Sequence, residues 1–129
     1  MSTDTAGSQT RETVGPAVGG AALDAAATRT TAHAPLLWAV AIASLVADGV
    51  LTVYGIRLGL TEVNPVAADL IAHVGALPAL ALLKGVALTV AVAGWVVMPE
   101  NYRGLVPAGL ALPWAVASLL NCVAVGLVL

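Results

Sequence analysis

Four polar residues stand in otherwise apolar stretches of the sequence: Asp48, Thr52, Lys84 and Asn121. An ionisable side chain at the centre of a bilayer costs about 2.5–3.5 kcal/mol on insertion scales, so it needs a partner of opposite charge or a water-filled cavity. Asp48 and Lys84 are suited to pair with each other, and the hydroxyl and amide offer hydrogen bonds beside them. We call these four residues the polar seam.

The members of the polar seam are also predicted to lie at similar depth. Counted from the ends of their apolar stretches on one side of the membrane, Thr52, Lys84 and Asn121 lie about seven or eight residues in, and Asp48 lies one helical turn deeper. The long stem of Lys84 covers that offset. We therefore expect an Asp48–Lys84 ion pair with Thr52 and Asn121 as hydrogen-bond partners.

Two interpretations of the polar seam stay open on the sequence. In the first, the protein is structural or binds a partner, and the seam locks the packing of its helices. In the second, the protein is a small transporter or channel in which Asp48 titrates. Since three helices are too few to enclose a pathway, the second interpretation requires an oligomer. The expected partners are the lipid bilayer and either a second copy or another membrane protein.

Other patterns that carry chemistry are absent from the sequence. His33 and His73 are the only histidines, Cys122 is the only cysteine, and neither H-E-x-x-H nor G-x-S-x-G occurs. His73 follows Asp69 by four residues, which predicts a pair on the surface of a helix rather than a metal site. We expect no catalytic residue, no cofactor and no metal ion.

The composition indicates a membrane protein. Of 129 residues, 60% are hydrophobic and 9% are charged, whereas a soluble domain carries about 25% charged residues. A small soluble chain has too much surface relative to its core to hide so much apolar area. The net charge of −2, with five Lys and Arg in all, argues against nucleic acid as a partner.

Hydropathy divides the chain into a tail and a membrane domain. Residues 1–34 are rich in Ala, Thr, Gly and Ser without hydrophobic periodicity, which predicts a disordered N-terminal tail. Residues 35–129 form the predicted all-α membrane domain. Its three transmembrane helices are expected at about 36–60, 77–98 and 105–128, each long enough to span a hydrocarbon core of roughly 30 Å.

The segment between the first two spans has the sequence TEVNP. Asn64 and Pro65 suit the N-cap and first position of a helix, and Glu62 suits its positive N-terminus. We call Glu62, Asn64 and Pro65 the loop motif, and its primary interpretation is a capping device. The helix that follows, about 65–74, is too short to span and is expected at the membrane interface. A single kinked helix over 65–98 is the alternative.

Basic residues in the short loops predict the orientation. Arg29 and Arg103 fall on the N-terminal side of the membrane and Arg57 falls on the other side. Because basic residues concentrate in cytoplasmic loops, this asymmetry favours a cytoplasmic N-terminus in a multi-pass protein of the cell membrane.

The order of these motifs resembles a known family. The pattern D-x-x-x-T at Asp48, then Gly59, then E-x-N-P at Glu62, then Lys84, is similar to that of the small prokaryotic membrane proteins grouped as domain of unknown function 5658. The resemblance covers about residues 36–127 and implies about three membrane helices, with no activity to carry over. It also implies the following signature positions: Asp48, Thr52, Glu62, Asn64, Pro65, Lys84 and Asn121.

Overall fold

The computed structural model describes residues 15–129, and over these residues the chain is α-helical without strands. Three segments are long and apolar enough to cross a membrane: α2, α4 and the stretch Glu100–Val128 that contains α5. This confirms the prediction of an all-α fold with three such helices. The elements in chain order are α1 (Gly15–Ala32), α2 (Ala34–Arg57), α3 (Pro65–Val74), α4 (Ala76–Val97), the 3₁₀ helix η1 (Glu100–Tyr102) and α5 (Leu105–Val128).

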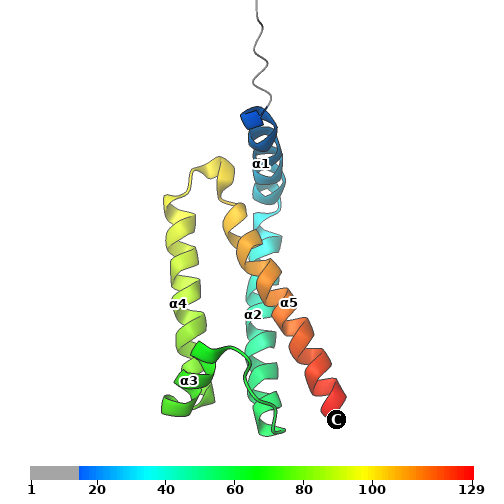
Figure 1. The fold of residues 1–129 in the computed structure, drawn as a ribbon. Helices are drawn as coiled ribbons and strands as arrows, with labels where there is room; N and C mark the ends of the chain where they lie inside the picture. The colour runs from blue at the N-terminus through cyan, green and yellow to red at the C-terminus, as the bar shows by residue number, and fades with distance from the viewer. Residues whose placement is uncertain (1–14) are drawn as a thin grey trace, which may run out of the picture.

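Helices α2 and α5 form the closest pair, and α4 stands beside them as the third long helix (Figure 1). Small residues fill the contact between α2 and α5: Ala41 is completely buried, and Gly55 and Ala111 are buried as well. Small side chains let two helix backbones approach closely, which favours helix association in lipid. Large apolar side chains such as Val90 and Leu120 are exposed instead, as expected of surfaces that face lipid.

Helix α2 ends at Arg57, earlier than the apolar stretch 36–60 suggested, because the chain turns at Gly59. Gly59 has a φ of 90°, a left-handed conformation that glycine adopts without a steric penalty. Its N–H donates to the Ile56 carbonyl, and the Leu60 N–H donates to the Gly55 carbonyl at 2.9 Å. This is the Schellman pattern of helix termination. It folds Leu60 back over Gly55 and directs the following loop along the end of α2.

Helices α3 and α4 are separate, which decides between the two interpretations of residues 65–98. The Asn64 side chain caps α3 by accepting hydrogen bonds from the Val66 and Ala67 N–H groups, at 3.1 and 3.5 Å. Pro65 occupies the first helical position. Gly75 then breaks the helix with a φ of 90°. The short helix over 65–74 is therefore present with the predicted bounds, and α4 begins directly after it.

Helix α1 corrects the expectation of a tail that is disordered up to residue 34. Residues 15–32 form a helix that stacks on the N-terminal end of α2 (Figure 1); the remainder of the predicted tail, residues 1–14, lies outside the described residues. Alanine has the highest helix propensity, and α1 is rich in it. A single helix of this length is only marginally stable alone, so its contacts with the rest of the protein decide the outcome.

Those contacts join α1 to η1 and to the start of α5. Thr31 Oγ1 donates to the Asn101 carbonyl at 3.1 Å and accepts from the Gly104 N–H at 3.2 Å. The Tyr102 hydroxyl donates to Asp24 Oδ1 at 2.6 Å. The composition of the segment gives no hint of these partners, which lie about 70 residues further along the chain.

Candidate functional site: the polar seam

Asp48 is the centre of the polar seam, and each of its carboxylate oxygens has a separate partner. Oδ2 forms an ion pair with Lys84 Nζ from α4. Oδ1 accepts a hydrogen bond of 2.6 Å from Asn121 Nδ2 of α5. The side chains of Lys84 and Asp48 are only 15% and 13% exposed. The carboxylate therefore links α2 to both neighbouring helices from within a largely buried position.

Thr52 completes the polar seam one turn along α2 from Asp48. Its Oγ1 accepts a second hydrogen bond from Asn121 Nδ2, at 3.0 Å, and the residue is buried. Residues four apart lie on the same face of a helix, so Asp48 and Thr52 present adjacent acceptors to one amide. The four side chains that the sequence analysis singled out thus lie in one connected cluster.

The lysine stem passes Gly49 of α2 on its way to Asp48. A Cβ at Gly49 would lie 3.4 Å from Lys84 Cε and 3.8 Å from its Cδ, which is ordinary van der Waals contact. Lys84 Nζ also lies 5.9 Å from the ring centroid of Trp114 on α5, within the range of a cation–π attraction. The ammonium group thus contacts both α2 and α5.

Two residues of this site were missed by the sequence analysis. Ser118 Oγ donates to the Ser44 carbonyl at 2.7 Å, which adds a link between α5 and α2. Trp114 and Ser118 precede Asn121 at spacings of seven and three residues. They therefore share its helix face, and applying the helical period to residues 105–128 would have found both.

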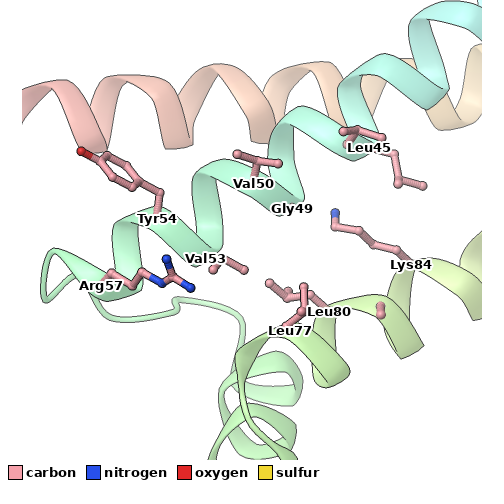
Figure 2. Close-up of a pocket in the computed structure, with 11 residues that line it drawn as sticks. Leu45, Gly49, Val50, Val53, Tyr54, Arg57, Leu77, Leu80 and Lys84 are labelled. Atoms are coloured by element: carbon pink, nitrogen blue, oxygen red, sulfur yellow. The ribbon is translucent and has the colours of Figure 1, made fainter.

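A groove of about 400 Å³ separates α2 from α4 on one side of the polar seam. Its lining is apolar except for Lys84 and Arg57, with Tyr54 also at its border. Figure 2 shows Lys84 extending from α4 toward Gly49 on α2, while Arg57 lies at the end of α2. Because α2 and α4 leave this groove open between them, the Asp48–Lys84 pair is a principal bridge from one helix to the other.

A second bridge between α2 and α4 lies nearer their other ends. The rings of Trp38 and Trp95 meet edge to face, with centroids 5.7 Å apart and planes inclined by 71°. Such aromatic pairs are worth about 0.5–1.5 kcal/mol beyond their buried area. Helix α4 is thus fixed to α2 at two levels, one aromatic and one ionic.

The loop motif divides between two roles. Asn64 and Pro65 cap α3, as described above, and Glu62 Oε1 accepts a hydrogen bond of 2.9 Å from the Asn64 N–H. Glu62 also lines a pocket of about 100 Å³ between α2 and α5, together with Thr52 and Asn121 of the polar seam. The structure thus brings one member of the loop motif to the polar seam and leaves the other two at the start of α3.

The pair of Asp69 and His73 that the sequence predicts lies away from the polar seam. On α3, His73 Nδ1 lies 3.8 Å from Asp69 Oδ1, and both side chains are largely exposed. His73 Nδ1 also bonds to the Asp69 carbonyl, at 2.8 Å. This geometry is that of a local pair on a helix surface.

The comparisons with known proteins give a family and nothing closer. The family described as Domain of unknown function (DUF5658) matches residues 38–129, which include every member of the polar seam and of the loop motif. No curated protein and no solved structure matches the chain.

Proposed function

The chain belongs to this DUF5658 family, and from the geometry of its polar seam we propose that it is a multi-pass membrane protein with a structural role. In this proposal the seam locks α2, α4 and α5 into one arrangement, whose fixed outer faces meet the bilayer and any membrane partner. The observation that carries the proposal is the division of Asp48, with one oxygen bound from α4 and the other from α5.

The energetics of burial support a locking role. A buried carboxylate without partners is costly. Asp48 is fully paired only when α4 places Lys84 beside it and α5 places Asn121 beside it. A sliding or rotated α4 would leave Lys84 and Asp48 unpaired in an apolar setting. The polar seam therefore penalises alternative packings more strongly than apolar contacts do.

A transporter in which Asp48 titrates is the alternative, and the same geometry supports it less. Both carboxylate oxygens of Asp48 already have partners, Lys84 and Asn121. A transport step at Asp48 would have to break these contacts and leave Lys84 without its partner in an apolar setting. The lock keeps both contacts.

Asn121→Leu tests the lock at its α5 side. The substitution removes the donor to Asp48 and Thr52, and we expect a loss of about 2 kcal/mol in the free energy of unfolding, as for a hydrogen bond to a charged group. Spin labels at Val50→Cys and Val123→Cys, both exposed positions, in a Cys122→Ala background, should report a broader distance distribution between α2 and α5.

Thr89→Val is the matched control for this experiment. Among residues 15–129, the Thr89 side chain bonds only to the Gly85 carbonyl of its own helix, at 2.8 Å, and is exposed on α4. The same polar-to-apolar change there should leave both the stability and the distance distribution unchanged. A lock at Asn121 is ruled out if its variant behaves like the control.

The proposed location is the cell membrane, with the N-terminus in the cytoplasm. Arg29 of α1 and Arg103 beside η1 lie at the same end of the molecule (Figure 1), and Arg57 ends α2 at the other. In a Cys122→Ala background, a membrane-impermeant maleimide applied to intact cells should label Asp69→Cys and spare Glu100→Cys. The reverse labelling would invert the orientation.

A further inference from the structure

We propose that the pocket between α2, α5 and the loop after α2 binds a small monovalent cation, for which Na⁺ is the probe. The pocket measures about 100 Å³, which is room for several water-sized groups. Four of its lining residues carry side-chain oxygens: Thr52, Thr61, Glu62 and Asn121. Oxygen atoms are the ligands that hard cations prefer.

The charge of Glu62 has no basic partner within the described residues. The ion pairs of residues 15–129 involve Asp48, Asp69 and Glu100 but not Glu62. Arg57, the nearest basic residue along the chain, lines the groove between α2 and α4 rather than this pocket. The N-terminus of α3 offsets only part of a full charge. A half-buried carboxylate in this position favours a bound cation.

One carboxylate oxygen of Glu62 already has a structural partner. Oε1 accepts from the Asn64 N–H, which holds the side chain beside the start of α3. Over the described residues Oε2 receives no hydrogen bond, so it is the oxygen available for a ligand. The loop thus positions the carboxylate of Glu62 without neutralising its negative charge.

Asn121 supplies the deeper ligand, which is its side-chain amide oxygen. The Asp48 carboxylate only accepts hydrogen bonds, so the amide nitrogen of Asn121 must face it. Both N–H groups of that nitrogen are used, by Asp48 and Thr52. The amide oxygen has no hydrogen-bond donor within residues 15–129, and Asn121 lines the pocket. A cation there contacts the same amide that binds Asp48, and so it supports the polar seam.

The ligand set favours a monovalent ion over a divalent one. Calcium sites use six to eight oxygens and gain affinity from the number of charged ligands. Over residues 15–129, no three His, Cys, Asp or Glu side chains gather as they would around a metal ion. A single carboxylate with neutral hydroxyl and amide oxygens balances one positive charge.

The test is the thermal unfolding midpoint of the full chain in nanodiscs, in NaCl against choline chloride at equal ionic strength. Choline is a bulky quaternary ammonium ion that oxygen ligands coordinate poorly, and general screening cancels because the two salts have equal ionic strength. With Na⁺ at about ten times its dissociation constant, we expect the midpoint to rise by roughly 5 °C over choline. Equal midpoints in the two salts for the unaltered protein would overturn the proposal without any variant.

Glu62→Gln locates the site. Glutamine keeps an oxygen for the Asn64 N–H, so the turn before α3 survives while the charge is removed. The advantage of Na⁺ over choline should vanish in this variant and persist in Asp69→Asn, which removes an exposed carboxylate on α3. If Glu62→Gln does not fold, Thr61→Val replaces it and should reduce the advantage. An Na⁺ advantage that is unchanged in Glu62→Gln, or in Thr61→Val where that variant replaces it, contradicts the assignment of the site.

Discussion

Lys84→Met and Asp48→Asn should each lower the free energy of unfolding by about 3 kcal/mol, because removing one partner of a buried ion pair strands the other charge. In Lys84→Met, Asp48 keeps its hydrogen bond to Asn121 but loses its compensating charge. In Asp48→Asn, the new amide offers one acceptor oxygen to two donors, Lys84 and Asn121, and Lys84 loses its counter-charge. The measurement is helical ellipticity against SDS fraction in mixed micelles.

The double variant separates a lock from two independent contacts. Asp48→Asn with Lys84→Met removes both charges, and methionine fits the apolar lining of the α2–α4 groove. We expect it to regain at least about half of the loss seen in either single variant, since an unpaired buried charge is worse than none.

Asp69→Asn is the control for the charge change itself. The Asp69 side chain is 80% exposed and that of its partner His73 is 71% exposed. Exposed ion pairs contribute about 0–1 kcal/mol to stability. This variant should unfold almost as the unaltered protein does. Full stability of both single variants of the polar seam would exclude a stabilising ion pair.

Gly104→Ala should release α1 from the rest of the protein. A Cβ on Gly104 would collide with the backbone of Thr30 and Thr31, and backbone atoms cannot rotate away as a side chain can. The hydrogen bonds of Thr31 to Asn101 and to the Gly104 N–H would be lost together. At about 1 kcal/mol for each hydrogen bond, we expect α1 to open roughly thirtyfold more often.

Hydrogen exchange of the α1 amides measures this opening. Gly109→Ala, in α5, is the matched control, because a Cβ there meets nothing within 4 Å. That substitution should leave α1 protected, and it should stabilise α5 slightly through the higher helix propensity of alanine. If α1 exchanges equally in both variants, the close crossing at Gly104 does not hold α1.

The failure to predict α1 has an identifiable physical reason. Its sequence lacks a hydrophobic stripe, so periodicity gives no signal, and its alanines favour a helix only weakly without support. The support comes from Asn101, Tyr102 and Gly104, which the chain brings back to the same end of the molecule after α2, α3 and α4. A contact across so many residues leaves no trace in the local composition.

The sequence by itself determined the properties that depend on local rules. Hydropathy and length identify the three long helices, and proline, asparagine and glycine fix the bounds of α3. The rise of a helix per residue is constant, so counting along each span brings Asp48, Lys84 and Asn121 to similar depth. The membership of the polar seam follows from these rules.

The tertiary structure decided everything that depends on how the helices rotate about their axes and where the loops run. It assigns one oxygen of Asp48 to α4 and the other to α5, and it adds Trp114 and Ser118 to the site. It also carries Glu62 to the pocket beside Asn121. Depth is a property of one helix, whereas rotation and loop path are set by the packing of all of them, so only the folded chain shows them.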